Sequence, residues 1–432
     1  MRWVGASFVL SVLASAASAT EVNYWLWDDQ QKPVYEECAK AFTSKNRGIT
    51  IKLTQRSWGK YWAGLTTGFA SGAAPDVFAN HLSQYPELAA SGKIVDLAPL
   101  IASDMVAMDR YAPGLLALWQ REGRTYGLPK DWDTVAIVYN AELLKAAGVT
   151  PQQLASASWT PKDGGEFQRL LARLTVDGSG RRGDEPGFDR TNVTQFGLVV
   201  QGSALDAIGQ VTWSGFAAAN GFRFPEGPRI ARYTYDDPKL AEAIQWLVEV
   251  SKKGYSAPAE DTRRGGGPSI FKEGRAALIV DGSWMMGAYV SQPKFKVGFT
   301  PLPKGPAGRK SMFNGLADSI WTGSKVPKQA WEWVKFLGSP ACQDIVASRA
   351  VVFPAVVSST AKAKEAFAKR GVDVSAYLDS AKPGTAVPYP VMDQSPRVNA
   401  VVSRSMEEIF LRGVDPKAEL ARANTILNSF GK

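Results

Sequence analysis

Hydrophobic residues recur with two different periods in residues 22–79. Ile49, Ile51 and Leu53 alternate with polar residues, which predicts a strand with one buried face. Other segments have the spacing of helices, and one of them stops at Gly72, a typical end signal. The predicted strands are residues 22–27, 49–54 and 74–79, and the predicted helices are residues 34–45 and 58–71. Alternation of this kind predicts a mostly parallel sheet with helices on both faces.

Residues 126–140 combine a polar segment with a hydrophobic one. Val135–Tyr139 is apolar and rich in β-branched residues, which predicts a strand buried on both faces. Just before it, Pro129–Asp133 contains a proline, a lysine, two aspartates and a tryptophan. These residues predict a stiff connection with a polar tip, in which an aspartate turn is the simplest structure.

A second alternation of helices and strands follows this central stretch. The predicted strands are residues 196–200, 275–280 and 296–300, and the predicted helices are residues 162–174, 237–254, 327–338 and 340–348. The C-terminal part of the chain is mainly helical by pattern, and no internal repeat is visible. The second series therefore has the same α/β order as the first.

Length and composition limit the classes of protein to which the chain can belong. At 432 residues the chain is long for a single core, so two domains are expected. Hydrophobic content of 45% and aromatic content of 11% favour a folded protein without a large disordered part. The formal net charge is +9, but basic residues are interspersed with acidic ones and form no stripe. Nucleic acid is therefore not an expected partner.

The N-terminus has the pattern of a cleavable signal peptide. Arg2 is the only charged residue in Met1–Ala19, an apolar segment follows it, and Ala17-Ser18-Ala19 has the small side chains that signal peptidase accepts. The apolar segment is too short to span a bilayer. No cysteine stands at the end of the signal, so no lipid anchor is expected. The sequence predicts an exported, periplasmic protein.

Cysteine and histidine are too rare for most metal and catalytic sites. Cys38 and Cys342 are the only cysteines and His81 is the only histidine, which excludes ordinary thiolate or imidazole metal sites, and no cofactor is expected. The same scarcity leaves no supported Ser-His-Asp triad. The two cysteines lie in helices assigned to different lobes below, so both are predicted to be free and largely buried thiols.

Polar and aromatic residues follow several predicted strands, where ligands bind in open α/β sheets. Indole rings can cover the apolar faces of a ligand, and Asp, Asn and Gln can bind its hydroxyl groups. Core packing is the ordinary role of a tryptophan and is predicted for Trp331 and Trp333. Trp284 is predicted to face a ligand, because the nearby Gly282 would let the backbone approach closely.

Several short motifs occur in one order over nearly the whole chain after residue 19. They are Ala70–Val77, Ala89–Gly92, Tyr126–Pro129 with Tyr139-Asn140, Phe271–Ala277 with Gly282–Trp284, and Ala330–Leu337. Their order and spacing resemble the extracellular solute-binding proteins (family 1) of sugar-importing ABC transporters, the group typified by maltose-binding protein.

The resemblance implies a two-lobed α/β fold, in which each lobe is a mostly parallel sheet flanked by helices and crossing hinge segments join the lobes. The N-terminal lobe would comprise residues 20–131 and 292–325, and the C-terminal lobe residues 132–291 and 326–432. The lobes would close on a neutral mono- or oligosaccharide. The protein, acting as a monomer, would then deliver this sugar to the membrane permease of an ABC importer.

The resemblance also assigns ligand contacts by position. Asp133 matches an acidic contact and Trp284 an aromatic platform, whereas Asn80 replaces a stacking tryptophan of maltose-binding protein. Either Asp28 or Asp29 is also expected to cap the helix that begins near Pro33. The resemblance also places Trp213 and the segment Tyr389–Arg397 near contacts of the second lobe. The implied ligand-binding residues are Trp27, Asp28, Asp29, Gln30, Asn80, His81, Gln84, Asp131, Trp132, Asp133, Trp213, Trp284, Asn314, Gly315 and Arg397.

Three other functions are alternatives to sugar binding for an ABC importer. An exported glycoside hydrolase needs two carboxyl groups roughly 5–10 Å apart; Asp131 and Asp133 make a poor pair, whereas Asp28 could face Asp133. A polyol or glycerol-phosphate ligand would need clustered donors or cations, and only Lys130 is near the carboxylates. A structural or adhesive protein would need no cleft. No enzymatic activity is expected.

Overall fold

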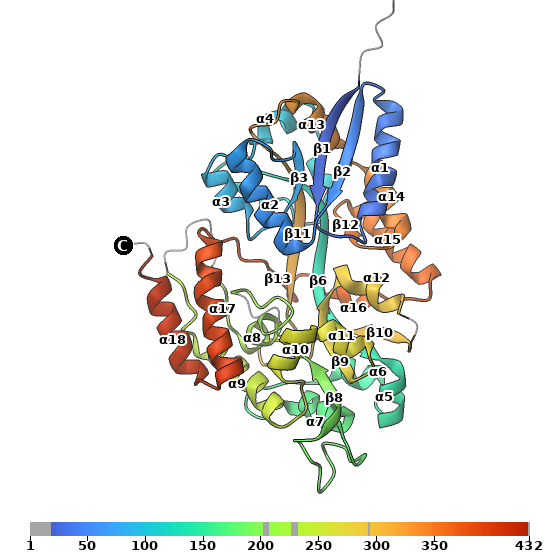
Figure 1. Cartoon of the computed structure of the whole chain (residues 1–432). Helices are drawn as coiled ribbons and strands as arrows, with labels where there is room; N and C mark the ends of the chain where they lie inside the picture. Colours follow the sequence, from blue (N-terminus) through green and yellow to red (C-terminus); the bar gives the residue numbers. More distant parts are fainter. Residues whose placement is uncertain (1–18, 202–206, 226–231, 293, 431–432) are drawn as a thin grey trace, which may run out of the picture.

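The chain folds into two α/β lobes that lie one above the other in Figure 1. The computed structural model describes residues 19–201, 207–225, 232–292 and 294–430. Residues 1–18 of the predicted signal peptide lie outside this described part. Among the described residues, no helix combines the length and the apolar character needed to cross a membrane.

The first lobe is built on a parallel sheet. β1 pairs in parallel with β2 on one side and with β3 on the other, which confirms the predicted βαβ pattern. The N-terminal elements of this lobe are β1 (Thr20–Leu26), α1 (Lys32–Lys45), β2 (Ile49–Gln55), α2 (Trp58–Ser71), β3 (Val77–Asn80), α3 (Tyr85–Ala90), α4 (Ala98–Ser103), β4 (Gln120–Arg121) and β5 (Arg124–Thr125).

Two long strands connect the lobes. The first half of β6 (Leu128–Asn140) pairs with β11 (Ser311–Ile320), and its second half pairs with β9 (Ala276–Gly282). β11 continues into the first lobe, where it pairs with β3. Figure 1 shows β6 and β11 running from one lobe into the other. The central stretch is therefore a crossing segment.

The connection predicted at Pro129–Asp133 is wrong, because these residues are the first half of β6. β11 pairs with them on one side, and β12 (Phe353–Pro354) pairs with Trp132 and Asp131 on the other. Pro129 has no N–H to donate, and the register of β11 shifts next to it. Partners from distant parts of the chain thus convert a turn-like sequence into a buried strand.

The second lobe continues the sheet in the order β6, β9, β8 and β7, and β10 pairs with the far end of β6. β8 and β9 are parallel, but β9 and β10 are antiparallel to β6 and β7 is antiparallel to β8, so the sheet of this lobe is mixed and not mostly parallel as predicted. The elements of this lobe up to β10 are α5 (Ala141–Ala147), α6 (Pro151–Ser156), α7 (Gly165–Leu174), β7 (Val176–Asp177), β8 (Val193–Val199), α8 (Ser214–Asn220), α9 (Pro238–Lys252), α10 (Ala259–Gly265), α11 (Gly267–Lys272), α12 (Met286–Val290) and β10 (Val297–Thr300).

The C-terminal part of the chain is shared between the lobes. In the first lobe, α13 (Pro327–Leu337) and α14 (Pro340–Arg349) pack on α1, and α15 (Val357–Lys369) packs on α14. The chain then crosses again through α16 (Ser375–Ser380) and β13 (Ala386–Pro388). In the second lobe, α17 (Ser395–Arg412) packs on α18 (Pro416–Leu427), which packs on α9.

Two of the predicted lobe boundaries are therefore corrected. Residues 326–432 were all assigned to the C-terminal lobe, but α13, α14 and α15 share the core of the N-terminal lobe. Residues 292–325 were all assigned to the N-terminal lobe, but β10 pairs with the end of β6 that lies in the C-terminal lobe. The third crossing was placed too early, because the chain leaves the first lobe only after α15. The second crossing was also placed too early, because the strand that returns to the first lobe is β11, which begins at Ser311.

The prediction of two free thiols is also wrong. Cys38 of α1 and Cys342 of α14 form a disulfide with a Cα–Cα distance of 5.2 Å, and both residues are fully buried. The prediction failed because it placed the two helices in different lobes. The bridge lies within the first lobe, so it does not span the cleft and does not restrain relative movement of the lobes.

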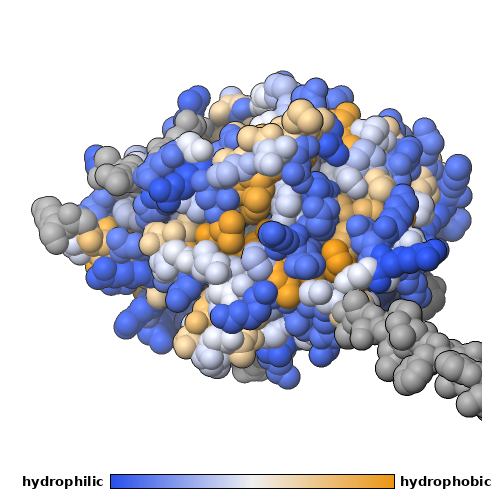
Figure 2. All heavy atoms as spheres, turned by 90° about the horizontal axis from the view of Figure 1, so that it is seen from above, coloured by the Kyte–Doolittle hydropathy of each residue, from blue (hydrophilic) through white to orange (hydrophobic). Residues whose placement is uncertain are grey.

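The cores and the surface agree with the pattern of the sequence. Trp331 and Trp333 are 4% and 0% exposed, which confirms their predicted packing role. The face seen in Figure 2 is largely hydrophilic, with smaller hydrophobic areas between the polar residues. Met105, which follows α4, is the most exposed large hydrophobic residue of the described chain at 87%.

Candidate functional site

A cleft of about 1140 Å³ lies between the lobes. Its first wall comes from the loops after β1 and β3 and from α2, its floor from the middle of β6 and β11, and its second wall from the segment after β9 and from α17. Eleven of the predicted ligand-binding residues line it: Trp27, Asp28, Asp29, Gln30, His81, Gln84, Asp131, Trp132, Asp133, Trp284 and Asn314.

A hydrogen-bonded network forms the floor. Asp133 of β6 lies opposite Asn314 of β11 in the strand register, and the Asn314 amide donates to its Oδ2 at 3.0 Å. Gln210 of the second lobe donates to Asp133 Oδ1 at 2.7 Å. The Asn314 amide nitrogen also lies 3.3 Å from His81 Nε2. The hydrogen bonds thus connect both crossing strands and the second lobe, and the His81 ring of the first lobe packs beside them.

Burial controls the charge of this floor. Asp133 is only 7% exposed, and burial together with the nearby Asp131 raises the pKa of its carboxyl group well above the usual range. Burial lowers the pKa of His81 to about 4, so this ring is neutral at pH 7. The backbone N–H of Ser83 donates to His81 Nδ1 at 3.1 Å, which orients the ring.

A buried ion pair supports the floor from below. Lys130 Nζ lies 2.9 Å from Asp131 Oδ2 and donates to Gln31 Oε1, and both charged residues are almost fully buried. The Lys130 ammonium also lies 4.3 Å from the centre of the Tyr35 ring. Burial lowers the pKa of Lys130, but Asp131 and Tyr35 outweigh it and hold the pKa above its ordinary value. The lysine is therefore charged and already paired.

Aromatic rings form the first wall. Trp27, Trp58, Trp62 and His81 contact one another edge to face or at a tilt, with centroids 5.0–6.3 Å apart. Tyr389 belongs to the third crossing segment, and the centroid of its ring lies 5.3 Å from the centroid of the His81 ring. Trp58 and Trp62 were not predicted as ligand residues. Their one signal is a spacing of four residues, which places both indoles on one face of a helix.

Trp284 lies on the second wall, in a short helical turn directly after β9. A Cβ atom on Gly282 would lie 1.9 Å from the Trp284 ring. Gly282 therefore makes room for the indole, and this replaces the prediction that it lets the backbone approach a ligand. Behind this wall, the Tyr289 hydroxyl donates to Asp281 Oδ2 at 2.5 Å, and burial raises the pKa of Asp281 to about 6.

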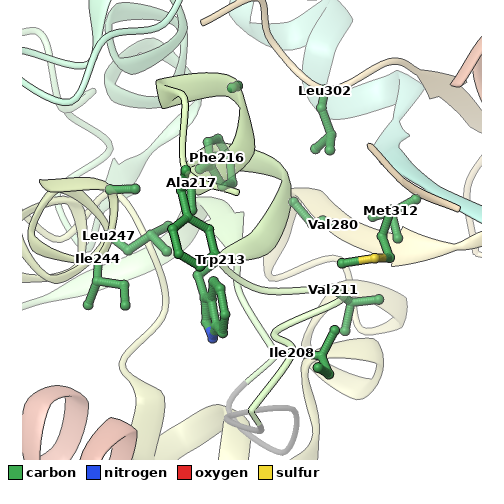
Figure 3. Packing of buried hydrophobic residues seen from close by; sticks show 14 of the residues in the cluster. Ile208, Val211, Trp213, Phe216, Ala217, Ile244, Leu247, Val280, Leu302 and Met312 are labelled. Atoms are coloured by element: carbon green, nitrogen blue, oxygen red, sulfur yellow. The ribbon is translucent and has the colours of Figure 1, made fainter. Parts of the chain in front are cut away.

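Four predicted residues do not line the cleft. Asn80 is fully buried and donates to Ser319, and Gly315 is a buried position of β11. The Arg397 guanidinium lies 3.7 Å from the centre of the Phe430 ring. Trp213 is 0% exposed, and Figure 3 shows it within the packed core of the second lobe near α8 and α9. Its role is that of a core residue.

Several residues that line the cleft were not predicted. They are spread over several parts of the chain, including α2, the residues after 206, the end of α11, the turn after β9 and α17. Among the described residues, Lys272 is the single lysine or arginine of the lining, and no cluster of His, Cys, Asp and Glu could hold a metal ion. The main additions are Gln31, Trp58, Trp62, Thr66, Gln210, Lys272, Met285, Asn399 and Ser403. Tyr389, Met392 and Ser395 also line the cleft, and they belong to the segment that the resemblance placed near second-lobe contacts.

Two α/β lobes, three crossing segments and a cleft lined by indoles and carboxylates define a two-lobed ligand-binding protein. The sequence places the chain more narrowly. It belongs to the bacterial extracellular solute-binding protein family, whose model matches residues 27–344.

Relatives and solved structures share this architecture. The chain is 23% identical over 333 residues to an arabinooligosaccharide-binding protein of Bacillus subtilis, which covers 73% of this chain and 69% of the relative. It is 27% identical to Mycobacterium tuberculosis UspC, with a TM-score of 0.74 over 95% of this chain and 99% of that one. An ABC substrate-binding protein of Listeria monocytogenes in complex with cycloalternan has the same fold, with a TM-score of 0.81, 19% identity and coverage of 95% and 99%.

Proposed function

We propose that the protein captures a neutral mono- or oligosaccharide in the interlobe cleft and delivers it to the membrane permease of an ABC importer. The observation that carries this proposal is the combination of indoles with carboxylate and amide groups around one cleft. Each carboxylate oxygen of Asp133 accepts one hydrogen bond, so each has a further lone pair that can accept from a sugar hydroxyl. Relatives named for oligosaccharide binding support the same class of ligand.

The protein is proposed to act as an exported periplasmic monomer that binds without catalysis. The signal-peptide pattern of Met1–Ala19 supports export. The arrangement of carboxylates speaks against a hydrolase, because Asp131 is paired with Lys130 and Asp133 is two residues away on the same strand. Incubation with oligosaccharides should release no new reducing ends. A phosphate-bearing polyol suits the cleft less well, since Lys272 is the single basic residue of the described lining and Lys130 is already paired.

The test of the proposed function is calorimetric titration with mono-, di- and trisaccharides, combined with small-angle X-ray scattering. At least one sugar should bind, and the radius of gyration should fall at saturation because lobes joined by crossing strands can close. A protein that binds no sugar but binds glycerol phosphate would overturn the proposal in favour of the polyol class. Binding without any change in radius would contradict closure.

Asp133→Asn should weaken sugar binding by about 1–3 kcal/mol, the usual cost of a mispaired buried polar group. Gln210 donates to one carboxylate oxygen and Asn314 to the other, so the new N–H₂ group would face one of these two donors. Titration of the variant with the sugar that binds best measures the loss. Asp76→Asn is the matched control, since Asp76 is a buried carboxylate outside the cleft that accepts from Ser324 and Asn23. If the two variants bind the sugar with equal affinity, Asp133 does not contact the sugar.

A further inference from the structure

We propose that Trp58 and Trp62 of α2 form a second sugar subsite beside the floor of the cleft, so that the ligand is an oligosaccharide of at least two units. This inference rests on the proposed function and deepens it, because it names the residues through which the affinity depends on ligand length. The floor around Asp133 would hold one sugar unit, and the indoles of α2 would hold the next.

One face of α2 runs along the cleft. Trp58, Trp62 and Thr66 are spaced by four residues, so they follow one another along a single stripe of the helix. All three line the cleft, together with Ala63. The lining thus extends over two turns of the helix, which suits an elongated ligand better than a single ring.

The exposure of Trp58 is not explained by packing. It is 46% exposed, whereas the neighbouring Tyr61 on the same helix is fully buried. Its ring contacts with Trp27, Trp62 and His81 are edge contacts with interplanar angles of 78–89°, so none of these rings is stacked flat on it. A large exposed indole at a cleft is available to stack on the apolar face of a sugar.

Trp62 contributes a polar group in the same place. Its indole N–H is buried and has no acceptor among the described residues. Other indole N–H groups without an acceptor belong to tryptophans of the core, such as Trp159 and Trp333, whereas Trp62 is partly exposed and lines the cleft. This nitrogen is inaccessible to water, so a sugar oxygen would accept from it only after the ring turns toward the ligand.

The two subsites are adjacent and the cleft has room for both. His81 contacts Trp58 with ring centroids 5.3 Å apart, and its Nε2 lies 3.3 Å from the Asn314 amide of the floor. The cleft volume of about 1140 Å³ exceeds the roughly 300–1,000 Å³ that is typical of sites for drug-sized ligands. The His81 ring lies between the floor and the indole of Trp58, so a ligand that contacts both sides would extend past this ring.

The test measures affinity as a function of ligand length. Calorimetry would use three linear series: glucose, maltose and maltotriose; mannose, mannobiose and mannotriose; and arabinose, arabinobiose and arabinotriose. The variants are Trp58→Ala, Trp284→Ala and the control Trp321→Ala. Trp321 is partly buried outside the cleft and lies against Phe69 of α2, so its removal reports on the packing of α2 alone. Thermal unfolding verifies that each variant is folded.

We expect the wild type to bind the trisaccharide of one series more tightly than its monosaccharide. Trp58→Ala should weaken trisaccharide binding by about 10- to 100-fold, the range of an aromatic hot spot, and change monosaccharide binding by less than about 3-fold. Trp284→Ala should weaken the binding of sugars of every length, and Trp321→Ala should leave the binding of all of them unchanged. The inference is overturned if Trp58→Ala leaves trisaccharide affinity unchanged, or weakens all lengths equally. A wild type that binds none of the nine sugars would instead overturn the proposed function.

Discussion

Lys130→Met should lower the free energy of unfolding by about 3–5 kcal/mol, because it leaves the buried Asp131 carboxylate without its counter-ion. Lys130 and Asp131 are 2% and 3% exposed, and their charged atoms lie 2.9 Å apart. Asp131 borders the cleft but is almost fully buried, so water can replace the lost partner only in part. The variant also removes the contact of the ammonium with the Tyr35 ring. Urea unfolding of the variant and the wild type measures the difference.

Two further variants make this experiment specific. Lys252→Met removes a lysine from a solvent-exposed pair with Glu249, at a similar distance of 3.0 Å, and should cost less than about 1 kcal/mol. Lys130→Met combined with Asp131→Asn should recover part of the loss, since no uncompensated charge remains. If Lys130→Met costs no more than Lys252→Met, the pair is not a buried support of the floor.

Replacing Cys38 and Cys342 together by alanine should lower the free energy of unfolding by about 2–5 kcal/mol. The bridge joins residues 304 positions apart, and such a link removes much conformational freedom from the unfolded chain. Sugar affinity should be nearly unchanged, because both helices lie in the first lobe and away from the cleft. Denaturant unfolding with and without a reductant, followed by sugar titration, measures both quantities.

A reductant provides the internal control for this prediction. It should destabilise the wild type by a similar amount and leave the double alanine variant unchanged. Thiol titration of the denatured, unreduced wild type should find no free thiol. Two free thiols would restore the sequence-based prediction and contradict the disulfide.

Local patterns determined the secondary structure of the first lobe well. The helix predicted at residues 58–71 is α2 (Trp58–Ser71), and it ends where Gly72 adopts a left-handed conformation with φ of 75°. The strand predicted at residues 49–54 differs from β2 by one residue. Such features depend on side chains a few residues apart, so the sequence carries them directly.

Local patterns also predicted part of the cleft lining. Loops that follow parallel strands meet at one edge of the sheet, which is why Trp27–Gln30 and His81 come together as predicted. Trp213 was misassigned because an apolar tryptophan near a helix start has the same pattern whether it faces a ligand or the core. Trp58, Trp62 and Gln210 were missed because nothing in their neighbours marks the direction of their side chains.

Tertiary structure alone decided the remaining features. Pro129–Asp133 is a strand because β11, which begins at Ser311, supplies its hydrogen-bond partners. Cys342 meets Cys38 because a third crossing leaves α14 in the first lobe. The sequence by itself determined the α/β order, the family and the loops at the sheet edge, since these depend on local spacing. Strand pairing, the bridge and the composition of the cleft depend on contacts between residues far apart in the chain, and local spacing does not encode them.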